Sequence, residues 1–349
     1  MFGKFRKIFS GSIGIDLGTA STLVYTKGSG IVINEPSVVA VNQKTGQVVA
    51  IGNEAKKMLG RTPSHITAVR PLVEGVISDF EAAQEMLAYF IKRTLKGKGG
   101  FFRPTMVIGV PSGITNVEVR AVRDAAKNSG AGDVHIVEEP LAAAIGVRMP
   151  IHEPIGNMIV DIGGGVTDIA VISMGGIVTA RNIRIAGGKL NQDIIQYARE
   201  EFKLLLGEKT AEEVKIAIGS VAKETEGLEA VIRGRDMVTG LPREVAVTDS
   251  DIREAIHKSI KTLINATRET IEVTPPELVA DIMHRGIVMT GGGAMLNGLA
   301  ALFESELKIP VYIAEDPLTA VVRGAGIILE DLENMGEVLL QNDEDLPPR

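Results

Sequence analysis

The sequence predicts an α/β protein made of two similar halves, each with a β-sheet of its own. Its 349 residues exceed what one compact core usually holds, which suggests two domains or one duplicated unit. Aligning Asp161 on Asp16 superposes VDIGGGVT on IDLGTAST, so that an aspartate, a glycine and a threonine coincide. In both halves a strand, a glycine turn and another strand follow one another. A repeat of this length indicates a duplicated domain rather than a solenoid.

The first half alternates predicted strands and helices. Alternating and β-branched residues predict strands in IGIDLG, TLVYTKG, GIVIN, SVVAVN and VVAIG. Apolar residues at helical spacing follow in FEAAQEMLAYFIKRTLK. The strand TMVIGVP then precedes a second helix, ITNVEVRAVRDAAKNSG, whose final glycine is a stop signal. EEPLAAAIGVRM is expected to be a third helix, with Pro140 near its first turn.

The second half repeats this order around a longer middle segment. MIVDIGGGVTDIAVISMGGIVTARNIRIAG predicts three strands separated by glycine turns. The charge-rich stretch from about Asn191 to Asp249 is interpreted as an insertion. A helix over residues 252–271 is expected to end at TPPEL, where two prolines stop it. IVMTGGGAMLNGLAALF predicts a strand, a glycine turn and a helix, and VYIAEDP and AVVRGAGIILEDL come after it. We expect the acidic tail, residues 341–349, to be disordered.

The composition excludes several classes of function. With 45% hydrophobic and 23% charged residues the chain is an ordinary globular one, and a net charge of −7 argues against a general nucleic-acid binder. The absence of cysteine excludes disulfides, thiolate metal sites and cysteine catalysis, and the five histidines lack metal-ligand spacing. No apolar run reaches the ~20 residues that span a bilayer, and the N-terminus lacks the apolar region of a signal peptide. We therefore expect a cytoplasmic protein.

Three glycine-rich turns form the candidate ligand site: DLGTAST, DIGGGVTD and TGGGAML. Bare backbone N–H groups in such turns bind anions, and the missing side chains let phosphate oxygens approach. Two facing turns from equivalent halves could clasp one polyphosphate. Asp16 and Asp161 would repel phosphate, but they can hold the waters of a Mg²⁺ ion that neutralises it. A single glycine turn is explained as well by a plain hairpin link; three such turns, two with equivalent aspartates, favour a site. P-loop and dinucleotide-binding glycine motifs are absent.

These turns, together with VPSGITNVEVRA, EEPLAAAIG and TPPELVADI, resemble the actin/heat-shock-70 ATPase superfamily. More closely, GIVINEPSVVA, GRTPSHI, AVRPLVEGVISDF and GRDMVTGLPRE are similar to the bacterial actins of the MreB/Mbl family, and the resemblance covers roughly residues 12–332. It implies a duplicated actin-like ATPase fold: two ribonuclease-H-like halves, four subdomains and ATP in the cleft between the halves. The implied bounds are 12–34, 80–153 and 322–340 for subdomain IA, 35–79 for IB, 154–189 and 252–321 for IIA, and 190–251 for IIB.

The resemblance also implies roles for individual residues, with ATP and Mg²⁺ as cofactors. The phosphates would lie against Gly18, Thr19, Ala20, Ser21, Gly163, Gly164 and Gly165. The adenosine would lie along Gly291, Gly292, Gly293 and Ala294, flanked by Glu212, Glu213 and Lys215. Glu139 matches the residue that orients the attacking water, and Asp168 is assigned to catalysis with it. An acid at the start of a helix is also favoured by the helix dipole, so Glu139 has a second explanation.

Two positions depart from the usual family sequence. Many relatives read GGGTTE where this chain has GGGVTD, so Val166 lacks a hydroxyl that would sit near the attacking water. Conventional actin also has Val-Thr there, so hydrolysis is compatible with this sequence while its rate stays open. Gly188, in AGGKLNQD, stands where the family's GGD or AGD carries an acid, which leaves one contact to the nucleotide open.

Two segments predict contact with a membrane. At helical spacing, the basic N-terminal segment (residues 1–11) gathers apolar side chains on one side, as interfacial anchors do: Phe2, Phe5, Ile8 and Phe9. Phe101 and Phe102 lie in a glycine-rich basic loop, where two adjacent aromatics seldom both find a core. Taken alone, the first segment is also explained by a disordered start or a packing arm. In a filament, weak anchors on many subunits would act together.

The sequence therefore predicts an actin-like filament protein at the inner face of the cytoplasmic membrane that organises cell-wall elongation and determines cell shape. It would bind ATP and hydrolyse it slowly as part of filament dynamics. The implied partners are further copies in double protofilaments, membrane lipids, and RodZ-like and other cell-wall elongation proteins, without nucleic acid. Two alternatives stay open: a small-molecule kinase whose insertion caps the substrate, and a nucleotide-bound scaffold that does not hydrolyse. A heat-shock-type chaperone would need a further peptide-binding domain, for which the given chain leaves no room.

Overall fold

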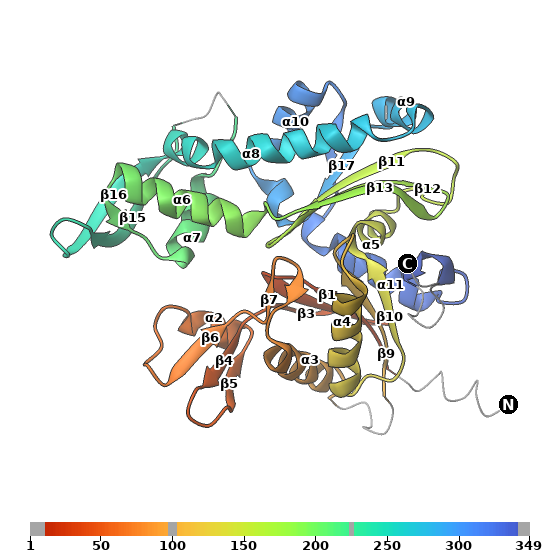
Figure 1. Ribbon diagram of the computed structural model, residues 1–349, viewed down its shortest axis with the longest axis horizontal. Helices are drawn as coiled ribbons and strands as arrows, with labels where there is room; N and C mark the ends of the chain where they lie inside the picture. The colour runs from red at the N-terminus through yellow and green to blue at the C-terminus, as the bar shows by residue number, and fades with distance from the viewer. Residues whose placement is uncertain (1–10, 97–102, 223–226, 341–349) are drawn as a thin grey trace.

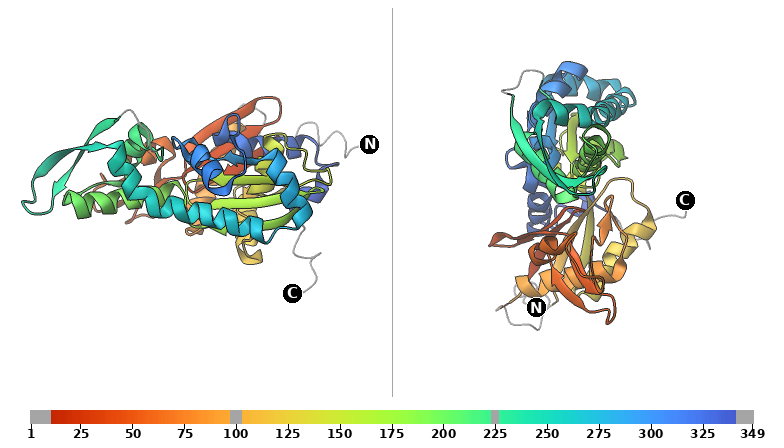
Figure 2. Two further views of the ribbon diagram at one scale, coloured as in Figure 1. Left: turned by 90° about the horizontal axis from the view of Figure 1, so that it is seen from above. Right: turned by 90° about the vertical axis from the view of Figure 1, so that its left-hand side faces the viewer.

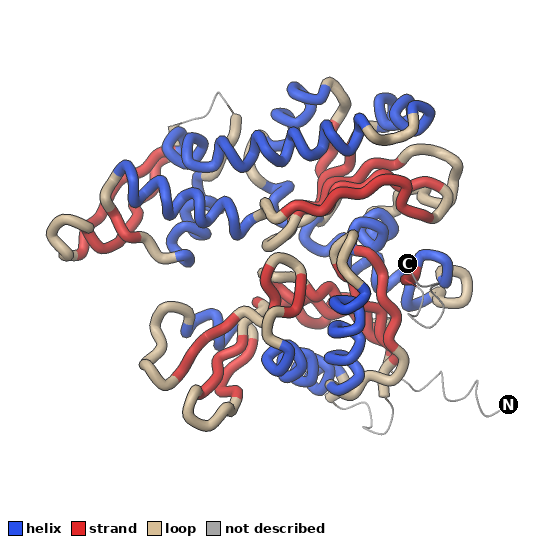
Figure 3. The backbone as a smooth tube through the Cα atoms, viewed as in Figure 1, coloured by secondary structure: helices blue, strands red, loops and turns tan. Residues whose placement is uncertain are grey.

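The computed structural model describes residues 11–96, 103–222 and 227–340. Its elements form two halves that lie one above the other in Figure 1, each with one large sheet and a smaller sheet at its left end. The tube of Figure 3 shows that helices lie beside both large sheets. The right-hand view of Figure 2 shows the same stacked halves, and the left-hand view, from above, shows a hairpin projecting from one end.

The large sheet of the first half has six strands in the order β19-β10-β9-β1-β2-β3. β1 (Ser12–Leu17), β2 (Ser21–Thr26) and β3 (Gly30–Pro36) are antiparallel neighbours. On its other side β1 is parallel to β9 (Thr105–Val110), which is parallel to β10 (Val134–Glu138). The short β19 (Leu339–Leu340) pairs antiparallel with β10 at the edge.

The large sheet of the second half repeats this topology in the order β13-β12-β11-β17-β18. β11 (Asn157–Ile162), β12 (Thr167–Ser173) and β13 (Gly176–Ile183) are antiparallel neighbours. β11 is also parallel to β17 (Ile287–Thr290), and β17 to β18 (Val311–Ile313). Except for β19, the two sheets match strand for strand in order and direction, which confirms the predicted duplicated α/β fold.

Two helices lie between the large sheets and join the halves. α5 (Glu139–Gly146) and α11 (Ala320–Glu330) share an apolar core with side chains of both sheets, among them Val107 and Ile159. The helices cross where glycine is required: a Cβ on Gly324 would lie 1.7 Å from the Ala142 carbonyl oxygen, far inside van der Waals contact. This close crossing fixes one half against the other.

The remaining helices of the halves pack on the outer faces of the sheets. α3 (Phe80–Thr94) and α4 (Asn116–Asn128) share a core with β1 and β9. α8 (Asp249–Glu272), α9 (Pro276–Arg285) and α10 (Leu299–Leu307) share another with β11 and β17. α4 and α8 both begin with a capping box, Thr115 with Glu118 and Thr248 with Asp251, which satisfies the first free N–H groups. The predicted helix over residues 252–271 is confirmed within a few residues.

Each half also carries a smaller arm. In the first half, α2 (Asn53–Met58) packs on the sheet of β4 (Val39–Asn42), β5 (Val48–Ile51) and β6 (Ile66–Val69), followed by the hairpin β7 (Leu72–Val73) and β8 (Val76–Ile77). In the second, α6 (Gly187–Glu201) and α7 (Glu208–Ile218) accompany β14 (Leu204–Leu205), β15 (Glu229–Asp236) and β16 (Pro242–Thr248). The stretch interpreted as an insertion therefore contains an ordered sheet. Three short 3₁₀ helices complete the described elements: η1 (Gly292–Met295), η2 (Pro317–Thr319) and η3 (Gly336–Val338).

Ion pairs join the two arms. Lys56 of α2 lies 3.2 Å from Glu212 of α7, and Arg70 lies 2.7 Å from Glu208 of the same helix. All four side chains are partly exposed, so each pair contributes little to stability on its own, about 0–1 kcal/mol. Their position nevertheless links the arms opposite the α5–α11 crossing.

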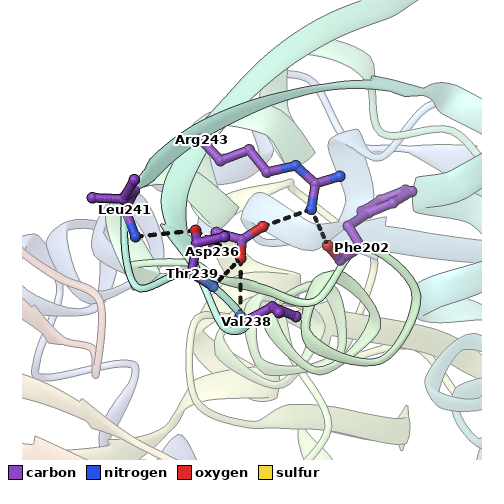
Figure 4. Close-up of polar contacts among 6 residues, drawn as sticks. All are labelled: Phe202, Asp236, Val238, Thr239, Leu241 and Arg243. Atoms are coloured by element: carbon purple, nitrogen blue, oxygen red, sulfur yellow. Dashed lines mark hydrogen bonds and ion pairs between the residues drawn. The ribbon is translucent and has the colours of Figure 1, made fainter.

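The hairpin of β15 and β16 ends in a turn that is held by Asp236 (Figure 4). One carboxylate oxygen accepts hydrogen bonds from the Val238 and Thr239 N–H groups at 2.9 and 2.8 Å, and the other lies 3.0 Å from Arg243. The Thr239 N–H and Arg243 lower the pKa of Asp236 to about 2. The turn presents apolar side chains to solvent, because Val238 is 84% and Leu241 65% exposed. The tip of this hairpin is therefore a stiff, apolar projection, whereas its strands carry charged side chains.

Some predictions lie outside the described residues. These are the membrane-binding side chains Phe2, Phe5, Ile8, Phe9, Phe101 and Phe102, and the tail over residues 341–349. Among the helices that the structure describes, none combines the length and the apolar character needed to cross a bilayer.

Candidate functional site

Four carboxylates gather where the two large sheets meet. Asp161 in β11 lies directly opposite Asp168 in β12, and Asp16 occupies the position in β1 that is equivalent to Asp161. Asp16 pairs with Gly109 of β9, where a Cβ would lie only 3.4 Å from Cγ of Glu139. The missing side chain at Gly109 therefore leaves room for Glu139, the first residue of α5, to join the group.

The four carboxylates of this group repel one another when they are charged. Burial raises the pKa of Asp16 to about 7. Burial and then the neighbouring charges, led by Asp168, raise the pKa of Glu139 and that of Asp161. Carboxylates brought together out of water favour protons or a cation. Oxygen donors of this kind suit Mg²⁺, which keeps much of its water shell, so the residues fit the expected ion. Over the described ranges no group of three or more His, Asp or Glu side chains is arranged to hold a metal ion directly.

The glycine turns of the two halves face each other. We refer to residues 18–21 as turn 1 and residues 163–165 as turn 2. A Cβ on Gly164 would lie 2.4 Å from Cβ of Ala20, and one on Gly165 would lie 2.4 Å from Oγ1 of Thr19. Real Cβ atoms do not approach so closely, so side chains in turn 2 would push the turns apart. This explains the second and third of the three glycines that interrupt the hairpin of β11 and β12.

The segment that follows the third strand of each half donates hydrogen bonds to the carbonyl oxygens of the turn in that half. In the first half Ser37 donates its hydroxyl to the Gly18 carbonyl oxygen at 2.6 Å and its N–H to that of Ala20 at 3.1 Å. In the second half the N–H groups of Gly187 and Gly188 donate to the Gly163 and Gly164 carbonyl oxygens at 3.0 and 2.8 Å. Gly188, the position without the family's acid, thus supports turn 2 through its backbone.

The third glycine turn packs against the end of β11. Gly291 has a left-handed φ of 78°, and a Cβ there would lie 2.4 Å from Oδ1 of Asp161. A Cβ on Gly293 would lie 2.2 Å from Cγ2 of Ile162. Gly292 lies next to Leu318, and Ala294 is fully buried. This turn therefore adjoins the carboxylates and adds backbone to the same site.

The three predicted residues of α7 have different surroundings. Lys215 donates a hydrogen bond from Nζ to the Gly187 carbonyl oxygen at 2.8 Å, beside turn 2, and burial lowers its pKa. Glu212 forms the ion pair with Lys56 between the arms. Glu213 lies on the exposed face of α7, 3.6 Å from Lys209, so the structure does not bring it together with the other two.

Sequence reasoning missed several residues of this site. The Gly75 N–H, in the turn between β7 and β8, donates to Oγ1 of Thr19 at 2.9 Å. Gly75 also packs close to Val166, the residue that replaces the usual threonine of the family. A Cβ on Gly75 would lie 3.3 Å from Cγ2 of Val166, so this turn covers the valine side chain. Ser112, just after β9, donates two hydrogen bonds to Asp168. The only local signals were the turn-forming pairs Glu-Gly and Ser-Gly in loops.

A cavity of about 560 Å³ adjoins the site at the junction of the halves. Its lining comes from the turn after β7, the end of β9 and the end of β13, and includes Glu74, Ser112, Asn182 and Arg184. Arg184 lies 3.0 Å from Glu74, which adds an ion pair between the halves at its rim.

Comparison with known proteins agrees with this architecture. The model of a family described as MreB/Mbl protein matches residues 10–337. Cell shape-determining protein Mbl of Bacillus subtilis is 50% identical over 328 residues, which cover 94% of this chain and 98% of that protein. Cell shape-determining protein MreB of Escherichia coli is 46% identical over 349 residues, which cover 98% of this chain and 100% of that protein.

Solved structures share the fold. The crystal structure of MreB5 of Spiroplasma citri bound to ADP has a TM-score of 0.88 and 40% identity, covering 93% of this chain and 99% of that one. The MamK double helical filament has a TM-score of 0.79 at 24% identity, covering 92% and 99%. The actin-like fold follows from this likeness.

Proposed function

Because this chain belongs to the MreB/Mbl family, we propose that it is an ATP-binding, actin-like filament protein that determines cell shape by organising cell-wall elongation. The observation that carries the proposal is the meeting of three glycine turns from two equivalent sheets around four carboxylates. Relatives of 46–50% identity are cell shape-determining proteins, and a 40% identical relative is solved with bound ADP.

Turn 1 and turn 2 would hold the phosphates, and the turn at Gly291 would adjoin the rest of the nucleotide. Asp16 and Asp161 would hold Mg²⁺ through its waters, which supplies the charge that neutralises the phosphates. Calorimetry with ATP, with and without Mg²⁺, tests this assignment. Replacing Asp161 by alanine should weaken Mg²⁺-dependent ATP binding at least about 100-fold while the protein stays folded. Unchanged affinity would remove the assignment of this site.

Hydrolysis would proceed by positioning of water rather than by a covalent intermediate. Glu139 and Asp168, on opposite halves, are the carboxylates proposed to orient that water. The variant Glu139→Ala should bind ATP normally but release phosphate at least about 100-fold more slowly per filament subunit. Equal rates in both proteins would end this role for Glu139. A faster rate in Val166→Thr would mean that the missing hydroxyl limits the wild type, and no hydrolysis by the wild type would favour the scaffold alternative.

The proposed protein assembles with further copies of itself and binds the membrane. We also propose that it has four subdomains and that it contacts RodZ-like and other cell-wall elongation proteins. The stiff projection at Val238 and Leu241 offers an apolar surface for another copy. Electron microscopy of the protein with ATP on anionic lipid should reveal membrane-bound double protofilaments. Phosphoryl transfer from ATP to a sugar or acetate, without filaments, would favour the kinase alternative instead.

The membrane assignment depends on the N-terminal phenylalanines and on the pair at residues 101 and 102. Deleting residues 1–9 and changing Phe101 and Phe102 to serine should each lower co-sedimentation of filaments with anionic liposomes. The two changes combined should nearly abolish it, because each anchor alone is weak and a filament binds as an array. If the combined variant still sediments with liposomes, the membrane contact lies elsewhere.

A further inference from the structure

One carboxylate of the site is fixed by donors from both halves of the protein. Asp168 is 1% exposed, and three hydrogen bonds reach its side chain. Ser112 donates its N–H at 2.9 Å and its hydroxyl at 2.5 Å, and the amide of Asn182 donates at 3.0 Å. All three bonds end on the same oxygen, Oδ1. A carboxylate can accept about four hydrogen bonds, so Oδ2 keeps its capacity to accept one from a water.

Asp168 is also the acid that acts most strongly on its neighbours. After burial, its charge is the largest cause of the raised pKa of both Glu139 and Asp161. A rotation of this carboxylate would therefore change the field at the residue proposed to orient the attacking water. The three bonds to Oδ1 prevent that rotation, because turning the group would leave buried donors without a partner.

The donors differ in the half that supplies them. Asn182 lies on β13, directly opposite Asp168 in the same sheet. Ser112 follows β9, in the large sheet of the other half. Ser112 is itself held firmly: it is 2% exposed, Pro111 precedes it, and Gly113 follows with a left-handed φ of 70°. The orientation of Asp168 therefore depends on how closely the first half approaches the second.

We propose that Ser112 is a positioning residue for ATP hydrolysis, which binds Asp168 across the junction and makes hydrolysis depend on the approach of the two halves. The inference rests on the proposed hydrolysis. In that reaction the bond from the terminal phosphorus to the ADP oxygen breaks and a bond to the water oxygen forms, while a water proton passes to the surroundings. Oδ2 of Asp168 accepts a hydrogen bond from that water, and Ser112 holds Oδ1.

The test measures ATP affinity and phosphate release for four full-length proteins: wild type, Ser112→Ala, Ser112→Thr and Ser305→Ala. Alanine removes one of the two bonds from Ser112 but keeps the backbone bond. It should slow phosphate release per filament subunit about tenfold and change ATP affinity less than about threefold. Threonine restores the hydroxyl at a position that lines the adjoining cavity, so the rate should return to within about threefold of wild type.

Ser305→Ala is the matched control. The Ser305 hydroxyl donates only to Leu302 of its own helix, at 2.9 Å on the surface, so its loss should leave the phosphate release rate unchanged. If Ser112→Ala does not fold, Ser112→Cys replaces it: the thiol is a weak donor, and the chain has no other cysteine with which it could form a disulfide.

The outcomes separate this inference from the proposed function. Normal hydrolysis by Ser112→Ala, or a slow Ser112→Thr, would overturn the positioning role while the proposed hydrolysis stands. Equal losses of affinity and rate would also overturn it, since a bond that merely joins the halves would act in that way. A wild type that binds ATP but releases no phosphate would instead refute hydrolysis and, with it, this inference.

A second comparison, of filaments with monomers, tests whether hydrolysis depends on the approach of the two halves. Asn182→Ala removes a donor from the same half as Asp168, so its effect should be similar in filaments and in monomers below the assembly concentration. Ser112→Ala should slow filaments at least about threefold more than monomers, if assembly brings the halves together. Equal slowing in both states for Ser112→Ala would refute the dependence on approach.

Discussion

The two halves hold equivalent turns by different means. In the first half, a serine side chain supports the turn: the Ser37 hydroxyl binds the Gly18 carbonyl oxygen and lies 2.8 Å from the Thr22 hydroxyl. In the second half, the backbone does the same work: Gly187 donates to the Gly163 carbonyl oxygen, while Thr167, the counterpart of Thr22, donates to the Ile185 carbonyl oxygen at 2.6 Å.

Despite this difference, both halves retain the same pattern of hydrogen bonds around the turn. Both threonines reach the segment after the third strand, and both turn carbonyls accept a hydrogen bond from that segment. The hydrogen bonds are alike, although the donor is a side chain in one half and an N–H group in the other. Because the backbone supports turn 2, the N-terminus of α6 lies against it, and the first two N–H groups of that helix are bound by the carbonyl oxygens of the turn. We therefore expect turn 2 to be intolerant of any side chain and turn 1 to depend on one hydroxyl.

The largest expected effect is steric and falls on turn 2. In Gly164→Val the new side chain would collide with Ala20 of turn 1, so the turns must separate. ATP affinity should fall about 100-fold, since overpacking of this kind costs about 1–3 kcal/mol. Calorimetry checks it, with Gly176→Ala as control, because the nearest atom to a Cβ there is 4.0 Å away. If Gly164→Val binds ATP normally, the tight approach of the two turns is not needed for binding.

The second effect is smaller and falls on turn 1. Ser37→Ala leaves the buried Thr22 hydroxyl and the Gly18 carbonyl oxygen without their partner, while the Ser37 N–H still binds Ala20. The free energy of unfolding should fall by about 2 kcal/mol and ATP affinity about fivefold. Denaturant titration and calorimetry measure the two changes. An affinity loss as large as that of Gly164→Val would contradict the contrast between the turns.

The sequence predicted the parts of the site that lie within one local segment. The strands around Asp16 and Asp161 and the three turns were found because alternation and glycine are local signals that occur twice. Ser37, Gly75 and Ser112 were not found, because their contacts form only when segments far apart in the chain meet. A serine that binds a carbonyl oxygen across two strands has the same local sequence as one that binds water.

Other misses have local causes. β10 is short and runs directly into α5, and the sequence predicted only the helix that begins at Glu138, with no strand before it. The arm around β15 and β16 is rich in charge, because one face of its small sheet is exposed, while the other face packs Ile232 and Val247 into the core of the second half. Glu213 was grouped with Glu212 and Lys215 by motif, but one helical step of about 100° carries it to the exposed face of α7.

The third prediction compares the equivalent threonines directly. Valine has the shape of threonine without the hydroxyl, so Thr22→Val and Thr167→Val each remove one buried hydrogen bond. Each should lower the free energy of unfolding by about 1 kcal/mol. Thr22→Val in a Ser37→Ala background should cost less than it does alone, because the two hydroxyls bind each other. Additive losses for that pair, measured by denaturant titration, would show that the hydroxyls act independently.

The smallest effect concerns pH and the equivalent aspartates. The pKa of Asp16 is raised to about 7 and that of Asp161 is also raised, both first by burial. The folded protein therefore binds these protons more tightly than the unfolded chain does. The resulting stability is complete below the unfolded pKa of about 4 and is lost as pH rises through the folded value near 7.

For nucleotide-free protein, the Tm should therefore fall by about 2 °C between pH 5.5 and pH 8. Asp16→Asn removes the titrating group, so its Tm should vary less over the same range, and ATP with Mg²⁺ should reduce the fall in the wild type. A Tm that depends on pH equally in wild type and Asp16→Asn would mean that Asp16 does not carry this proton, and that its counterpart Asp161 or Glu139 does.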